Sequence, residues 1–358
     1  MPKGVNAGTY YDWTFYHSSF PAYQINKWLE ISSQRFLHPV FRSFQSELEN
    51  VYEEYNRSQD DQGRAQNQFV MEKAFEGHPY SRSIIGLPEH LKNPRLSKLI
   101  EFYEQWYVPE NMVLVLVGNI KAQQISGRIN AAFGRLAAKP APERKVYQNL
   151  EIKGRKQYSA KVGFYPQVAM VFNGVPAGHP DEDALDIALA LLNNNSQTGT
   201  MDKLVLDGEL TSAGAYTRTF REQGRAIVAA IPPSTTKTSA VSSLPRAPKM
   251  KALKAIQQIA NGEFEDWKID AIKAEKCRQF DLEMESNEDK AMILMNAFYN
   301  EQDLGDILNY KDKIMAITTD DIKRVAKKYL SDNYLALYIE KMESLTRTPR
   351  LRSRVTNP

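Results

Sequence analysis

Residues 107–120 read YVPENMVLVLVGNI, and this stretch decides which kind of fold the chain can adopt. Its centre is a continuous apolar run between Asn111 and Gly118. A short apolar run bounded by such residues is typical of a buried strand, so we predict a strand over 111–118. The patterns on either side, near 94–106 and 121–134, predict helices. Helices and strands therefore alternate along the chain.

The sequence before this stretch continues the alternation. The first 20 residues are rich in aromatic and β-branched side chains, which predicts one or two strands ending at Pro21. Apolar side chains then recur at helical spacing. The helices predicted from them cover about 25–36, 42–57 and 64–76.

After a proline-containing linker at 136–145, the pattern starts again. The second half is predicted to contain strands at 168–177, 216–220, 225–232 and 334–341, a polar loop at 233–249, and two or three helices within 250–330. The fold class is α+β. We expect two similar domains, each a mostly antiparallel sheet with helices packed on one face. Their predicted bounds are 1–138 and 146–345, followed by a basic tail or linker at 346–358.

The composition excludes several classes of protein. The chain is 42% hydrophobic and 25% charged, with a net charge of +3, so nothing favours a nucleic-acid partner. No apolar run reaches the roughly 18 residues of a membrane span. Cys277 is the single cysteine, which excludes a disulfide within the chain and a cysteine-based metal cluster.

Two glutamates are the first candidates for chemistry. Glu47 and Glu54 stand seven residues apart, two helical turns, so both carboxylates lie on one helix face. Such a face is either solvated or directed at a cation, and a metal is one possibility. None of the five histidines has another three or four residues away, and the chain contains no HExxH or HxxEH pair.

Several motifs together resemble the pitrilysin/insulinase family of zinc metallopeptidases. The matching stretches are NAGTYYDWTFY at 6–16, ELENVYEE at 47–54, HPY at 78–80, and the opening stretch at 107–120. A further one at 193–217 resembles a glycine-rich family segment, with Asn193, Asn194 and Asn195 in place of glycines. The resemblance extends over residues 4–341, and the order and spacing of the motifs carry it.

This resemblance implies a site. Glu54 matches the glutamate that binds zinc, and Glu47 matches the glutamate that supports it from two turns away. Asn6, Ala7 and Gly8 match an edge strand on which an extended peptide substrate is laid. The family's HxxEH, which supplies two histidine ligands and the general base, is not in this chain. We therefore expect Zn²⁺ in a complete enzyme but no stable binding by this chain, which would be inactive alone.

Partners and alternatives follow from the same resemblance. The expected partners are peptide substrates and either a second half of the parent polypeptide or a homologous subunit. Two alternatives stay open, a non-catalytic structural or peptide-binding homologue of the same fold, and a peptide-binding module that uses only the edge strand. The location favoured by the resemblance is the bacterial periplasm or cell envelope.

Overall fold

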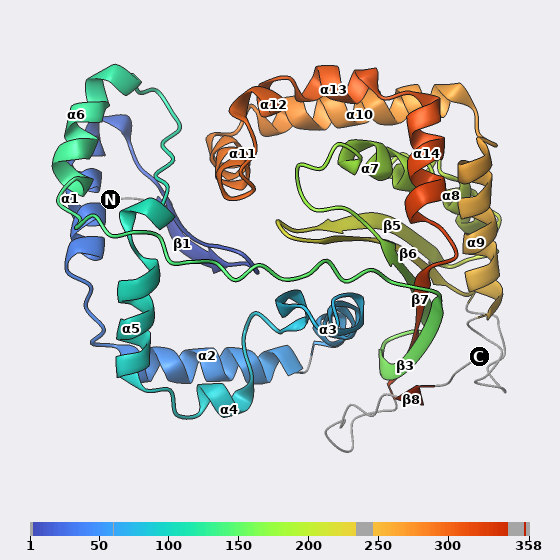
Figure 1. Ribbon diagram of the computed structural model, residues 1–358, viewed down its shortest axis with the longest axis horizontal. Helices are drawn as coiled ribbons and strands as arrows, with labels where there is room; N and C mark the ends of the chain where they lie inside the picture. Colours follow the sequence, from blue (N-terminus) through green and yellow to red (C-terminus); the bar gives the residue numbers. More distant parts are fainter. Residues whose placement is uncertain (1–2, 60, 234–245, 343–353, 356–358) are drawn as a thin grey trace. The chain divides into compact units, whose positions relative to one another are not determined.

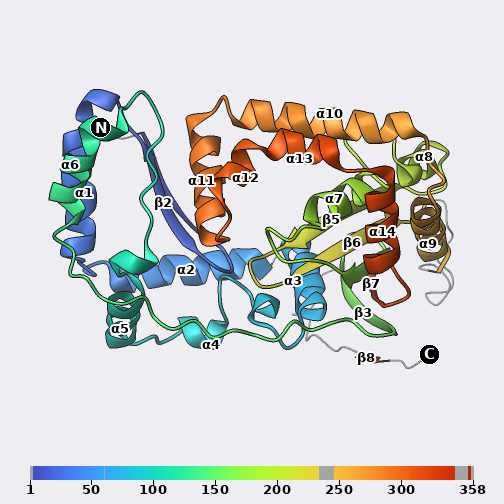
Figure 2. The ribbon, with the colours of Figure 1, turned by 45° about the horizontal axis from the view of Figure 1, so that its top comes forward.

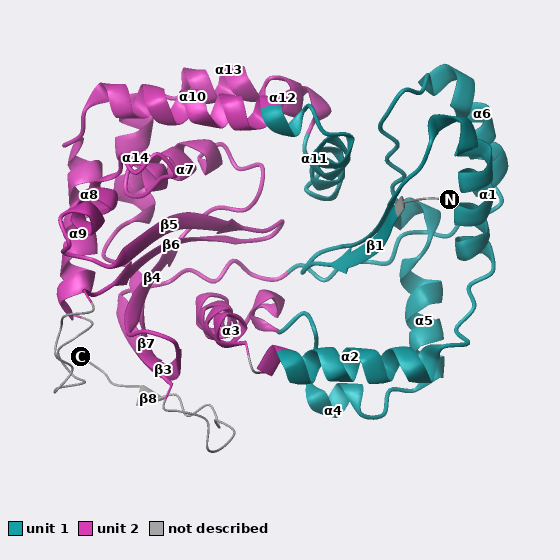
Figure 3. Cartoon of the chain, turned by 180° about the vertical axis from the view of Figure 1, so that it is seen from behind, with its two compact units in different colours: residues 1–57, 83–146, 282–302 teal, residues 58–82, 147–281, 303–358 magenta. Residues whose placement is uncertain are grey.

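The chain forms two compact units with mixed α and β structure (Figure 3). The computed structural model describes residues 3–59, 61–233, 246–342 and 354–355. Unit 1 comprises residues 1–57, 83–146 and 282–302, and unit 2 comprises residues 58–82, 147–281 and 303–358. Each unit therefore combines segments that are distant in the sequence. The α+β prediction is confirmed, while the predicted domain bounds stay a prediction.

The elements run from β1 to β8 and from α1 to α14 (Figure 1). Those that lie in unit 1, or begin there, are β1 (Lys3–Thr9), β2 (Thr14–Ser19), α1 (Ile25–Leu37), α2 (Phe44–Gln59), α4 (Pro88–Leu91), α5 (Leu96–Trp106), α6 (Ala122–Phe133) and α11 (Asn287–Tyr299). The remaining helices are α3 (Gln62–Ala74), α7 (Glu182–Ala190), α8 (Thr200–Leu206), α9 (Arg246–Asn261), α10 (Asp266–Glu283), α12 (Leu304–Leu308), α13 (Tyr310–Ala316) and α14 (Thr319–Tyr329). The remaining strands are β3 (Arg155–Gly163), β4 (Gln167–Asn173), β5 (Ser212–Thr219), β6 (Gly224–Ile231), β7 (Tyr334–Lys341) and β8 (Arg354–Val355).

Unit 2 is built on a six-stranded sheet in the order β5-β6-β4-β7-β3-β8. Only β3 and β7 are parallel, so the predicted mostly antiparallel sheet is confirmed for this unit. Its central strand β4 reads QVAMVFN, and all five residues between the two ends are buried. Such a run is expected of a strand covered on both faces.

Helices cover both faces of this sheet (Figures 1 and 2). On one face, Val168, Met170 and Phe172 join a core that α7, α9 and α14 complete. On the other, α3 contacts β3 and β7, and the side chains of Gln66 and Gln167 are hydrogen-bonded at 2.6 Å. Helices were predicted on one face of the sheet only. The structure has α7, α9 and α14 on one face and α3 on the other.

Unit 1 contains a two-stranded sheet and a small helical core. Strands β1 and β2 form an antiparallel hairpin in which Ala7 lies opposite Tyr16 and Gly8 opposite Phe15. Helices α1 and α6 pack together through Ile25, Leu29, Ile125 and Ala132. Among the helices of the described residues, none is both long and apolar enough to cross a bilayer.

Some sequence predictions were wrong. The predicted strand over 111–118 is not a strand, because no described strand pairs with its backbone, and pairing defines a strand where side-chain pattern does not. The region predicted to hold two or three helices holds six, α9 to α14. Strand β3 was missed.

Two further predictions fall largely outside the described residues. Of the loop predicted at 233–249, residues 234–245 lie outside them, and α9 begins at Arg246. Of the tail at 346–358, only β8 is described.

Candidate functional site

The glutamate pair lies on α2, as the spacing predicted. Glu47 and Glu54 are both exposed, and in the whole of α2 only Ser58 is buried. The apolar neighbours Leu48 and Tyr55 are half-buried, whereas Val51 is exposed. Of the two settings expected for this helix face, the carboxylates therefore have the solvated one.

Neither carboxylate has a protein partner in the described part of the chain. Other polar side chains of the same helix do pair: Arg57 with Glu53 at 3.6 Å, and Gln45 with Glu49 at 3.0 Å. No group of three His, Cys, Asp or Glu residues that could hold a metal occurs among the described residues. A catalytic zinc site uses three protein ligands, so the residues present here do not fit one.

The predicted peptide-binding strand is β1, and no described strand lies beside one of its edges. In the described sheet β1 pairs with β2 alone. Asn6 and Ala7 are exposed and Gly8 is half-buried. The Ala7 amide donates to Asn6 Oδ1 at 2.9 Å, so the Asn6 side chain occupies a backbone donor that an added strand could use.

Aromatic side chains stiffen the hairpin that presents this edge. Trp13 stacks on Tyr10 at 4.9 Å between ring centroids, and also contacts Phe15 and Tyr299. The Phe15 ring lies so close to Gly8 that an added Cβ would come within 2.3 Å of it. Glycine at this position thus lets the ring cover the strand.

A pair of tyrosines, Tyr16 and Tyr107, joins the β1–β2 hairpin to the stretch at 107–120. The hydroxyls of Tyr16 and Tyr107 are 2.7 Å apart, and Tyr107 stacks on Tyr103 at 4.6 Å. Burial, together with the hydrogen bond to Tyr16, raises the pKa of Tyr107 far above its usual value. The hydroxyl therefore stays protonated at neutral pH and can act as a donor.

Two family models match the chain. Residues 95–276 match the model of the peptidase M16 inactive domain, and residues 3–87 match the model of the insulinase family, peptidase family M16. The chain belongs to the M16 peptidase family. The resemblance carried by the sequence motifs is thereby confirmed.

Several relatives of this M16 chain carry the name zinc protease. The zinc protease PqqE of Helicobacter pylori is 22% identical over 334 residues, which cover 91% of this chain and 74% of that protein. The crystal structure of a protease from Helicobacter pylori matches with a TM-score of 0.81 at 20% identity, covering 94% of this chain and 82% of that one. The periplasmic protease PqqL of Escherichia coli matches with a TM-score of 0.75 at 15% identity, and this chain covers 39% of it. Both structures show the fold.

The histidine of the HPY motif, His78, is buried in unit 2 and hydrogen-bonds to Tyr80 and Glu222. His78 Nδ1 accepts from the Tyr80 amide at 3.2 Å, so Nε2 carries the proton and faces Glu222 Oε2 at 3.1 Å. The Tyr80 hydroxyl in turn accepts from the Glu222 amide. Both ring nitrogens are engaged within the protein, which indicates a structural role for this histidine.

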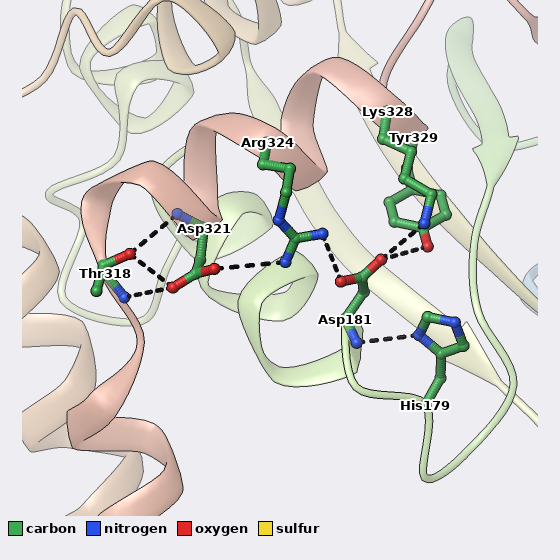
Figure 4. Close-up of polar contacts among 7 residues, drawn as sticks. All are labelled: His179, Asp181, Thr318, Asp321, Arg324, Lys328 and Tyr329. Carbon is green, nitrogen blue, oxygen red and sulfur yellow. Dashed lines mark hydrogen bonds and ion pairs between the residues drawn. The ribbon is translucent and has the colours of Figure 1, made fainter.

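A polar cluster at the start of α7 was not anticipated from the sequence (Figure 4). The buried Asp181 carboxylate accepts from Arg324 at 2.6 Å, Lys328 at 2.9 Å and the Tyr329 hydroxyl at 2.7 Å. Burial would raise the pKa of Asp181, but these three donors overcome it and hold the pKa well below the usual range. The acidic helix start was visible in the sequence, whereas the partners on α14 lie more than 140 residues away.

The pKa of the neighbouring Glu182 is shifted in the opposite direction, which predicts that the stability of the fold depends on pH. Burial raises the pKa of Glu182 to about 7, against the hydrogen bond from the Gly178 amide. Because the folded state binds this proton more tightly than the unfolded state, the contribution to stability is complete below about pH 4.5 and is lost as the pH rises through about 7. We expect Glu182→Gln to remove this dependence in urea titrations between pH 5 and 8.

The exposed Glu151 offers a matched control for that measurement. Glu151→Gln should leave the pH dependence of the urea midpoint as in the unchanged chain. Identical pH profiles for the unchanged chain and Glu182→Gln would contradict the assignment.

Proposed function

We propose that this M16 chain contributes to a zinc-dependent peptidase that it cannot complete alone. In this proposal β1 binds an extended peptide through Asn6, Ala7 and Gly8. Glu54 supplies one metal ligand, and Glu47 supports it. The other ligands and the general base come from a second polypeptide segment, either another half of the parent protein or a homologous subunit.

The edge of β1 that pairs with no described strand is the observation that carries the peptide-binding part. Backbone amides and carbonyls at a sheet edge can pair with an extended peptide and add it as a further strand. Stacked aromatic rings hold the hairpin rigid, so little order has to be created on binding. Backbone pairing reads shape more than sequence, which supports a broad range of peptide substrates.

A proline substitution tests this part. Ala7→Pro removes the amide from the middle of the edge, and we expect binding of a labelled, unstructured peptide of about ten residues to weaken roughly tenfold in fluorescence anisotropy, a loss of about 1.4 kcal/mol. Ala7→Ser keeps the amide and serves as the control. In a background in which Trp28, Trp106 and Trp267 are replaced by Phe, the fluorescence of Trp13, which stacks within the hairpin, reports whether the hairpin stays formed. Equal affinity for all three chains would refute peptide binding at β1.

Calorimetric titration with Zn²⁺ tests the metal part. One exposed carboxylate with no second ligand binds zinc weakly, so we expect no stoichiometric site of micromolar affinity in this chain. Glu54→Ala and the control Glu53→Ala should both behave like the unchanged chain. A micromolar site that is lost in Glu54→Ala alone would show that the chain completes a zinc site after all.

The alternative is a non-catalytic homologue that only binds peptides or supports an assembly. The lack of a three-ligand cluster among the described residues is compatible with it. The genomic sequence preceding the codon for Met1 discriminates between the two. An in-frame HxxEH there would exclude the alternative.

We propose a location in the bacterial cell envelope, which the description of PqqL of Escherichia coli as a periplasmic protease supports. Fractionation by osmotic shock tests this location. Recovery with cytoplasmic markers alone would refute it.

A further inference from the structure

The sequence contains two Asn-Gly pairs, Asn173-Gly174 and Asn261-Gly262. In such a pair the amide nitrogen of the glycine can attack the side-chain carbonyl carbon of the asparagine. Glycine favours this reaction because it has no Cβ to shield its nitrogen and its backbone turns freely. The two pairs carry the same reactive groups, so only their surroundings in the fold distinguish them.

The first pair is held in place by the sheet of unit 2. The Asn173 side chain accepts from the Ile152 amide at 2.8 Å and donates to the Ile152 carbonyl at 3.0 Å. Asn173 also pairs with Arg225 of β6, and a Cβ on Gly174 would come within 2.7 Å of the Arg225 backbone. Because the side-chain amide is bound at both ends and the glycine is enclosed, the reaction requires the sheet to open.

The second pair lies at an exposed helix end. Asn261 is exposed and is the last residue of α9. Gly262 follows with a φ of +78°, the left-handed conformation in which many helices end. Its amide donates to the Ile259 carbonyl at 3.0 Å, a bond of the last turn, where helices fray. Fraying of this turn frees the Gly262 nitrogen while the sheet stays intact.

A carboxylate lies beside the group that would leave. Asn261 Nδ2 donates to Glu263 Oε1 at 2.9 Å, and Glu263 is itself exposed. This hydrogen bond keeps the side-chain amide close to the backbone that follows it. The amide is therefore near the attacking nitrogen and accessible to water at the same time.

We propose that Asn261 is a site of spontaneous deamidation in the folded protein and that Asn173 is protected from it. The Gly262 nitrogen loses its proton to water and forms a bond to Asn261 Cγ. The bond from Cγ to Nδ2 breaks, and Nδ2 takes up a proton and leaves as ammonia. Water then opens the cyclic imide at either carbonyl, giving aspartate or isoaspartate. The reaction consumes water, releases ammonia and needs no oxidant or cofactor.

The product places a negative charge where the fold disfavours it. The carbonyls at a helix C-terminus already carry partial negative charge, so a carboxylate there lowers stability. The carboxylate of Glu263 also loses its amide donor and faces a like charge. Lys323 lies beside Gly262 but is already paired with Asp320 at 2.6 Å, so it offsets little of this. Deamidation therefore loosens the end of α9, which carries the wholly buried Ile259.

Peptide mapping by mass spectrometry tests the site in the full chain. After long incubation in mildly alkaline buffer, the peptide with Asn261 should gain the mass that replaces an amide by an acid and elute as two isomers. The peptide with Asn173 should convert at least about tenfold more slowly, because opening β4 requires a larger unfolding event than fraying of a helix end. Asn261→Gln should abolish the mass gain in its peptide.

The chain unfolded in urea is the matched control. Both pairs should convert at similar rates there, since the sheet no longer protects Asn173. Equal rates for the two pairs in the folded chain overturn the proposal. So does an Asn261 that stays unchanged in the folded chain after the unfolded chain has converted.

Thermal unfolding tests the consequence for α9. Asn261→Asp introduces the charge of the product and should lower Tm by about 2–4 °C. Asn195→Asp adds the same charge to the exposed loop between α7 and α8 and should leave Tm unchanged. The incubated chain should show a lower Tm than the fresh chain, and incubated Asn261→Gln should not. Equal Tm values for Asn261→Asp and Asn195→Asp would refute the loosening of α9.

Discussion

Arg225→Met should lower the free energy of unfolding of unit 2 by about 3 kcal/mol, because it removes a buried charged donor from three backbone carbonyls. Arg225 lies in β6 and is almost wholly buried. Its guanidinium donates to the carbonyl oxygens of Ala74 at 2.8 Å, Gly224 at 3.0 Å and Leu150 at 2.5 Å. It also lies 5.2 Å from the centre of the Phe75 ring.

The carbonyl of Ala74 explains the size of this effect. It belongs to the last turn of α3, where carbonyls have no partner within the helix and a cation is favourable. Burial lowers the pKa of Arg225 to about 10, so the side chain is still charged at neutral pH. Arg225 therefore attaches the end of α3 to β6.

Thermal unfolding followed by circular dichroism measures the loss. For a unit of roughly 200 residues, about 3 kcal/mol corresponds to a fall in Tm of about 6–12 °C. Arg155→Met is the control, since Arg155 is exposed and pairs with Asp332 at the surface, and it should change stability by less than about 0.5 kcal/mol. Equal losses for the two variants would show that the buried contacts of Arg225 contribute little. Arg225→Lys should recover only part of the stability lost in Arg225→Met, because one ammonium cannot reach all three carbonyls.

Asp181→Ala should lower the free energy of unfolding by about 2–3 kcal/mol, the second largest effect that we expect. The variant leaves the hydroxyl of the buried Tyr329 without its acceptor. Arg324 and Lys328 contribute less, since their side chains are about half exposed and water replaces part of the lost contact. Chemical denaturation at neutral pH measures the difference. Asp332→Ala, at an exposed carboxylate, is the matched control.

The pH dependence of this stability difference distinguishes a contribution from the charge of Asp181 from a contribution of packing alone. Because the pKa of Asp181 is lowered in the folded state, its contribution is present above the usual carboxyl pKa of about 4 and is lost as the pH falls below it. The advantage of the unchanged chain over Asp181→Ala should therefore shrink steadily as the pH is lowered from about 5 to 2. An advantage that stays constant over this range would contradict the charged cluster. A double-mutant cycle with Tyr329→Phe measures the hydroxyl contact itself.

Local pattern predicted most of the elements, and it failed where partners decide the outcome. The aromatic and β-branched start predicted β1 and β2, and helical spacing predicted α1, α2 and α3. The apolar run at 112–117 fitted a buried strand equally well, yet no described strand pairs with it, and Val113 and Leu114 are exposed. The two-turn spacing of Glu47 and Glu54 placed both on α2, but it could not show that both are exposed.

By itself, the sequence determined the family, the α+β class and the helix that carries Glu54, because motif order, periodicity and helical spacing depend on residues close together in the chain. Only the tertiary structure decided that Asp181 meets Arg324 and that Arg225 meets Ala74. These outcomes depend on residues brought together from distant positions, where burial and backbone pairing are settled by packing. The run within YVPENMVLVLVGNI shows the difference, since its apolar pattern fits a buried strand, yet the described strands do not include it.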